Sequence, residues 1–268
     1  MHREDARRLT AGLNVQIRSR FLVATIFCMM FSAFPITAQE HDSAHNWDYG
    51  DLQGPQHWGE LTPQFAACKE GRRQSPIDIR NPQGAELAPI QFDYKASPLD
   101  IIDNGHTVMI NYAAGSSISV GTKKFKLEQF HFHRPSEEMI NGKRYEMVVH
   151  LVHADQQGQL AVVAVLVQEG KENLLVRDLW DNLPKEKGKE YSSKTIQIDA
   201  AMMLPASRSY YTFVGSLTTP PCTEGVTWFV LKYPVTMSSA QIERFATLYP
   251  NNARPIQPLY GRKVMETK

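Results

Sequence analysis

Phenylalanine and histidine alternate from Phe130 to His133, directly after Gln129, and this pattern constrains the fold more than any other feature of the chain. Successive side chains of a β-strand point to opposite faces, so a strand here places His131 and His133 on one face and the phenyl rings on the other. The segment from residue 144 to residue 152 is rich in β-branched and apolar residues, and it follows Asn141-Gly142, a pair typical of tight turns. These two segments are therefore predicted to be neighbouring strands.

A third histidine, His150, lies in the second predicted strand and is expected to face the first two. Three neutral imidazoles that converge from rigid strands, with no fourth protein ligand in view, suit a catalytic zinc ion that keeps one position open for water. A His-x-His pair alone is more often a structural or surface feature, and the third histidine leaves the two interpretations about even. His153 lies on the opposite face of its strand, so we interpret it as a core or second-layer residue and not a ligand.

The first 20 residues are rich in arginine, and an apolar run of about 16 residues follows them. The run is short for a membrane-spanning helix and small residues follow it, so we expect a cleaved signal peptide over residues 1–38. Cys28 would leave with this peptide. Cys68 and Cys222 would remain in an oxidising compartment, the periplasm or the medium, and we predict that they form a disulfide.

The rest of the chain, residues 39–268, has no internal repeat, no low-complexity linker and no second apolar run long enough to cross a membrane. One domain of this length is expected. The formal net charge of the whole chain is +1 and the basic excess lies in the N-terminal segment, so neither nucleic acid nor a membrane is indicated as a partner of the mature protein. The sequence does not set the oligomeric state and leaves a homodimer open.

Most of this domain has β-rich or alternating patterns. The predicted strands cover residues 116–120, 126–133, 146–152, 160–168, 211–214 and 227–231. The uninterrupted apolar run from Leu160 to Val167 indicates a strand covered on both faces. Helices are few: Ser238 begins a capping box and Pro250 ends the helix that follows, and a shorter helix is predicted over residues 174–180.

Four shorter motifs would each be unremarkable singly. They are Gln74-Ser75-Pro76-Ile77-Asp78-Ile79, Asp103-Asn104-Gly105-His106, Ser216-Leu217-Thr218-Thr219-Pro220-Pro221-Cys222 and Asn252-Ala253-Arg254-Pro255. Together with the histidine window, and in this order, they resemble the α-class carbonic anhydrases of exported bacterial type over residues 47–262. The resemblance implies a mainly β (α+β) domain over residues 39–268, built on a large twisted, mostly antiparallel central sheet of about ten strands with short peripheral helices.

The resemblance also implies an enzyme that reversibly hydrates carbon dioxide to bicarbonate and a proton, by attack of hydroxide generated at a zinc ion. The matched zinc ligands are His131, His133 and His150. Thr218 matches the residue that accepts a hydrogen bond from the hydroxide, and Glu137 matches the carboxylate that accepts the proton of Thr218. His106 matches a shuttle that exports the released proton, with an exposed loop histidine as the alternative interpretation.

Further matched positions surround the metal. The apolar wall against which carbon dioxide would lie consists of Val152, Val162, Leu217 and Trp228, with Thr219 beside it at the substrate pocket. Tyr49 and Asn104 would order the water chain that leads to His106. Acceptors for the N–H groups of His131 and His133 would be Gln129 and Asn252.

One position departs from the family pattern. Val148 stands two residues before the third ligand, where members usually carry a glutamate that accepts the other N–H of that ligand. Such outer partners change metal affinity or activity by about 10–100-fold. Glu138 and Glu146 are near in sequence, but neither matches the missing position, so we expect His150 to donate to a backbone carbonyl, a hydroxyl or a buried water. The chain should then bind zinc less tightly, and Val148→Glu should slow the loss of zinc.

Two other functions are weighed beside the hydratase. A zinc hydrolase acting on esters would use the same hydroxide, but no nucleophile motif or leaving-group acid is visible. A non-catalytic binding module occurs among relatives that have lost a ligand histidine, whereas this chain keeps all three ligand positions.

Overall fold

The structure is a computed structural model, and it describes residues 47–268. The predicted signal peptide and Cys28 lie outside the described residues. The strands of the main sheet are β2 (Gln83–Ala85), β3 (Ile90–Asp93), β4 (Ser97–Asp103), β5 (Val108–Asn111), β6 (Ser117–Val120), β7 (Lys123–His133), β10 (Met147–Ala154), β11 (Leu160–Glu169), β12 (Lys189–Ile198), β13 (Tyr210–Ser216), β14 (Glu224–Leu231), β15 (Val235–Met237) and β16 (Met265–Thr267).

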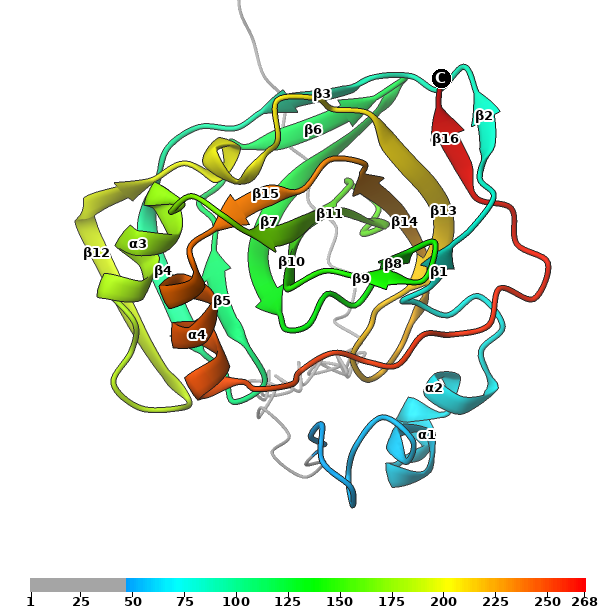
Figure 1. Cartoon of the computed structure of the whole chain (residues 1–268), viewed down its shortest axis with the longest axis horizontal. Helices are drawn as coiled ribbons and strands as arrows, with labels where there is room; N and C mark the ends of the chain where they lie inside the picture. Colours follow the sequence, from blue (N-terminus) through cyan, green and yellow to red (C-terminus); the bar gives the residue numbers. More distant parts are fainter. Residues whose placement is uncertain (1–46) are drawn as a thin grey trace, which may run out of the picture. The chain divides into compact units, whose positions relative to one another are not determined.

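These elements form one large, mixed and twisted sheet of 13 strands (Figure 1). Its main path runs in the order β12-β4-β5-β7-β10-β11-β14-β13-β16-β2, and β3, β6 and β15 join beside this path. Most neighbours are antiparallel, while β14 and β15 pair with β11 in parallel and β2 pairs with β16 in parallel. The mainly β fold class predicted from the sequence is confirmed.

A second sheet has three short strands, and the helices are short. The strands are β1 (Asp78–Ile79), β8 (Met139–Ile140) and β9 (Lys143–Arg144). The helices are α1 (Trp58–Leu61), α2 (Ala67–Glu70), α3 (Leu174–Asp181) and α4 (Ser239–Leu248), with 3-10 turns at Pro63–Phe65 and Ala200–Met203. None of the helices in residues 47–268 is long and apolar enough to span a membrane.

The segments predicted to be regular are confirmed as β6, β7, β10, β11, β13, β14, α3 and α4. At the start of α4 both bonds of the capping box are present, because Ser238 accepts from the Gln241 N–H and the Gln241 side chain accepts from the Ser238 N–H. The edge strand β12 was not predicted. Its pattern of burial is largely exposed, so it lacks the apolar alternation that reveals a strand.

Strand β11 lies between two apolar layers, as its uninterrupted apolar sequence predicted. Ala161, Val163 and Val165 pack into the larger core, while Val162 and Ala164 pack into a second cluster on the other face. The second cluster also contains Val148 and Trp228, and it borders the predicted metal site. One face of the sheet therefore serves the core and the other carries the site.

A β-bulge in β7 aims the histidines at the second face. Leu127 pairs with His153 and Gln129 pairs with Val152, so Glu128 is an extra residue between them. Before the bulge the odd-numbered residues Phe125 and Leu127 face the core. After it the even-numbered residues Phe130 and Phe132 face the core instead. Gln129 and both histidines of β7 consequently point away from the core.

Candidate metal centre

Strands β7 and β10 bring the three histidines together. His131 lies directly opposite His150 in the antiparallel pair, and His133 lies opposite Val148. One nitrogen of each imidazole lies within 4.8 Å of the ligand nitrogens of the other two, and this is the one such cluster of metal-ligating groups in residues 47–268. The convergence predicted from the spacing is therefore observed.

Hydrogen bonds fix which nitrogen of the first two histidines points inward. Nδ1 of His131 lies 2.8 Å from Oε1 of Gln129, and Nδ1 of His133 lies 2.7 Å from the backbone carbonyl of Asn252. A carbonyl oxygen only accepts, so Nδ1 carries the proton in each ring and Nε2 keeps its lone pair. Asn252 is thus an acceptor for His133, as expected, through its backbone carbonyl, while its side-chain Oδ1 accepts from the backbone N–H of Arg134.

The third histidine is held by Glu138. Both carboxylate oxygens of Glu138 lie 3.3 Å from Nε2 of His150, so Nδ1 is the nitrogen that faces the cluster. The expectation that His150 donates to a backbone carbonyl, a hydroxyl or a water is wrong. Alternation along β10 could not identify this acceptor, because Glu138 belongs to the bend before β8 and reaches His150 from outside the strand.

Glu137 lies beside the cluster and joins it to the loop after β13. Its Oε1 accepts from the backbone N–H of Arg254 at 2.7 Å, and its carboxylate accepts from the hydroxyl of Thr218. Burial raises the pKa of Glu137 to about 7, although His150 and the Thr218 hydrogen bond oppose this. The two residues that the resemblance paired are thus in contact.

The donor set fits a metal ion that prefers nitrogen ligands. Burial lowers the pKa of His131 to about 3 and that of His133 well below its usual value, so both rings stay in the neutral form that binds metals. Nε2 of His133 and Oε2 of Glu137 are buried without a hydrogen-bond partner, and they lie 3.4 Å apart. Such orphaned polar atoms are costly unless a further group occupies the space that they face.

An apolar wall adjoins the histidines on the same face of the sheet. Val152 pairs with Val162, which pairs with Trp228, so the three residues form a row across β10, β11 and β14. The Trp228 ring lies 4.9 Å from that of His150, centre to centre. Leu217 packs against the same cluster, and Thr219 lies in the loop that follows Thr218. The four apolar residues named for the wall therefore lie close together on this face.

His106 lies half-buried in the turn between β4 and β5. Asn104 forms this turn, since its Oδ1 accepts from the backbone N–H groups of His106 and Thr107 at 2.9 Å. The Trp47 ring stacks on His106 at 3.7 Å between ring centres and 7° between planes, a contact that sequence patterns did not indicate. Burial lowers the pKa of His106, which the nearby Asp48 carboxylate opposes. The hydroxyl of Tyr49 is buried and has no hydrogen-bond partner.

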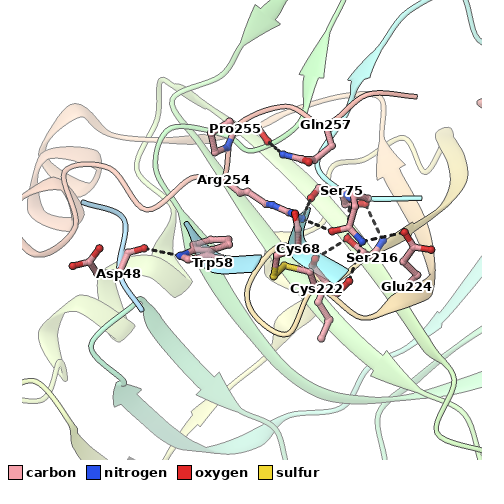
Figure 2. The surroundings of a disulfide bond; sticks show 12 residues. Asp48, Trp58, Cys68, Ser75, Ser216, Cys222, Glu224, Arg254, Pro255 and Gln257 are labelled. Atoms are coloured by element: carbon pink, nitrogen blue, oxygen red, sulfur yellow. Dashed lines mark hydrogen bonds between the residues drawn. A yellow bond between two sulfur atoms is a disulfide. The ribbon is translucent and has the colours of Figure 1, made fainter. Parts of the chain in front are cut away.

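The predicted disulfide between Cys68 and Cys222 is present, with the Cα atoms 5.0 Å apart (Figure 2). It ties α2 to the loop that carries Thr218. Arg254 lies beside it, buried to 1% exposure, and its guanidinium donates to the backbone carbonyls of Cys68 and Ser75. The sequence placed Arg254 in a motif but gave it no role.

A model of the eukaryotic-type carbonic anhydrase family matches residues 53–268. The chain belongs to this family. Among its relatives, the carbonic anhydrase of Nostoc sp. is 42% identical over 236 residues, which cover 86% of this chain and 89% of the relative. The carbonic anhydrase of Klebsiella pneumoniae is 40% identical over 241 residues, which cover 89% and 96% of the two chains.

Solved structures of carbonic anhydrases have the same fold. A hyperthermostable carbonic anhydrase from an active hydrothermal vent chimney superposes with a TM-score of 0.81 at 45% identity, over 83% of this chain and 100% of the other. The α-carbonic anhydrase of Thermovibrio ammonificans, in complex with the inhibitor sulfanilamide, gives a TM-score of 0.80 at 43% identity over 82% and 99% of the two chains. The family assigned from the sequence motifs is thereby confirmed.

Proposed function

We propose that this carbonic anhydrase homologue is a zinc enzyme that reversibly hydrates carbon dioxide to bicarbonate and a proton. The observation that carries the proposal is the convergence of three imidazoles whose outward nitrogens are fixed by Gln129, Asn252 and Glu138. His131 and His133 would hold the ion through Nε2, and His150 through Nδ1. When bound, zinc would supply the Lewis acidity that makes hydroxide available near neutral pH, an effect for which carbonic anhydrases are the standard example.

The residues around the ion would orient the reactants. Because the Thr218 hydroxyl donates its proton to Glu137, its oxygen can only accept from the nucleophile, which turns a lone pair of the nucleophile toward the substrate. The row of Val152, Val162 and Trp228, with Leu217, would bind carbon dioxide without competing hydrogen bonds. Thr219 would lie at the edge of this pocket.

His106 would carry the released proton to solvent. Its imidazole is half-buried in a turn, and an imidazole both accepts and releases a proton near neutral pH. Stacking on Trp47 would hold the His106 ring in a single orientation. Tyr49 and Asn104 would order the water between His106 and the metal site. The side-chain Oδ1 of Asn104 already accepts from the backbone N–H of His106 in the turn.

Residues 1–38 would direct export and be removed, which leaves residues 39–268 as the catalytic domain. The Cys68–Cys222 disulfide supports an oxidising compartment. We assign the mature enzyme to the periplasm, with release to the medium as the alternative destination.

Stopped-flow measurement of carbon dioxide hydration tests the proposal. The protein of residues 39–268 is assayed in three states: as purified, after a chelator has removed its metal, and after zinc has been added back. We expect hydration in the first and third samples and its loss in the second, and His131→Ala should not recover with zinc. Hydration that is absent from the zinc-loaded protein would refute the proposal, and an ester substrate assayed in parallel would detect a hydrolase instead.

A further inference from the structure

We propose that Glu138 is the positioning residue for the metal ligand His150, and that positions 138 and 148 are exchangeable. The centre needs one carboxylate at either position and an apolar side chain at the other. This inference rests on the proposed zinc function, because it concerns how a ligand of that ion is oriented. It explains together why Glu138 is buried and why an apolar residue at position 148 is tolerated.

The burial of Glu138 requires a donor. Its side chain is fully buried, and the His150 imidazole is the polar group within 3.3 Å of its two oxygens. A carboxylate removed from water is strongly destabilising unless it is paired or hydrogen-bonded. The N–H at Nε2 of His150 supplies that bond, and the bond in turn leaves Nδ1 free of its proton and directed at the ion.

The backbone at Glu138 is anchored independently of its carboxylate. The hydroxyl of Ser136 donates to the backbone carbonyl of Glu138 at 2.9 Å and accepts from the N–H of Tyr145 at 2.9 Å. The guanidinium of Arg144 donates to the backbone carbonyl of Ser136 at 2.8 Å. The bend before β8 is thus fixed to Arg144 at the end of β9 and to Tyr145 after it, so the carboxylate is presented in one position.

Val148 occupies the alternative place for a carboxylate. It lies on β10 two residues before His150 and therefore on the same face, and it is fully buried in the apolar cluster that borders the site. A glutamate there would approach His150 along the strand, whereas Glu138 approaches it from the bend. His150 has one N–H to donate, so two carboxylates would leave one of them buried without a partner, and no carboxylate would leave the N–H unpaired.

A double-mutant cycle measures the exchange through the rate of zinc loss to a strong chelator. The zinc-loaded proteins are the unsubstituted chain, Glu138→Ala, Val148→Glu and the double variant Glu138→Ala/Val148→Glu. Glu138→Ala should lose zinc about 10–100-fold faster, Val148→Glu should also lose it faster, and the double variant should return most of the way to the original rate. Glu146→Gln is the matched control, because it removes an exposed carboxylate of the same segment and should leave the rate unchanged.

Circular dichroism of each protein before chelation establishes that it is folded. If Glu138→Ala does not fold, the nearly isosteric Glu138→Gln replaces it, and its amide should still give measurably faster zinc loss. Zinc loss from the Glu138 variant at the rate of Glu146→Gln would overturn the positioning role. If the double variant loses zinc as fast as Glu138→Ala does, the proposal that positions 138 and 148 are exchangeable is overturned. A protein that binds zinc but does not hydrate carbon dioxide would refute the proposed function, while these rates would still test the ligand's orientation.

Discussion

Replacing Arg254 with methionine should lower the free energy of unfolding by at least about 3 kcal/mol while leaving the metal centre assembled. The guanidinium donates to the backbone carbonyls of Ser75 at 2.8 Å and Cys68 at 2.9 Å (Figure 2). It also donates to Oε1 of Gln74 at 2.8 Å. Methionine fills a similar space but has no donor, so three buried acceptors lose this partner. Each buried polar group left unpaired costs about 1–3 kcal/mol, and the lower end of this range gives the stated minimum.

The metal centre should survive because Arg254 contacts it through the backbone. Its N–H donates to Glu137, and any residue except proline keeps that bond. We therefore expect the hydration rate at low temperature to stay close to that of the unsubstituted chain. A large loss of activity in a protein that is still folded would refute this separation of the two roles.

Unfolding in guanidinium chloride, followed by tryptophan fluorescence with the disulfide intact, measures the change in stability. Arg177→Met is the matched control, since its guanidinium is exposed on α3 and pairs with Asp178 at the surface. The control should change stability by no more than about 0.5 kcal/mol. A loss clearly below about 3 kcal/mol for Arg254→Met would show that water or neighbouring groups satisfy the acceptors, and the reasoning from buried hydrogen bonds would fail.

Three further predictions concern proton export and the disulfide. His106→Ala should slow turnover in dilute buffer but not the hydration step itself, and added imidazole should restore part of the loss; unchanged turnover would remove His106 from the mechanism. Trp47→Ala should expose His106 and so raise its pKa toward the usual value, as measured by NMR titration, because burial is what lowers it. Reduction of the Cys68–Cys222 disulfide, which spans 154 residues, should cost roughly 4–5 kcal/mol of stability in chain entropy, and thiol titration of unfolded, unreduced residues 39–268, from which Cys28 has been removed, should find no free thiol.

Local sequence patterns predicted those parts of the site that lie within single strands. The alternation at His131 and His133 and the β-branched segment that contains His150 defined two strands and the face that they share. The bulge at Glu128 was not predicted, because the apolar pattern on either side of it is a regular alternation and only the change of parity marks the extra residue. The alternation of side chains after the bulge was enough to place His131 and His133 on the correct face.

Contacts between distant segments could not be predicted in this way. Arg254 bonds to Gln74, which is 180 residues away, and Trp47 stacks on His106 from the N-terminal segment. Neither contact leaves a periodic pattern in the sequence, since each depends on how the chain outside the strands returns to the sheet. A buried arginine and a tryptophan in a polar segment are signals of packing, but they do not identify the partner.

The comparison of positions 138 and 148 shows how one such contact reverses a prediction. From the sequence, Val148 left His150 without a carboxylate, so Val148→Glu was expected to slow the loss of zinc. In the structure Glu138 already accepts from His150, and a second carboxylate on the same buried face would have no donor. The same substitution is therefore expected to weaken zinc retention while Glu138 is present and to strengthen it once Glu138 is removed. Consecutive residues Glu137 and Glu138 thus serve different partners, Thr218 and His150, from one anchored bend.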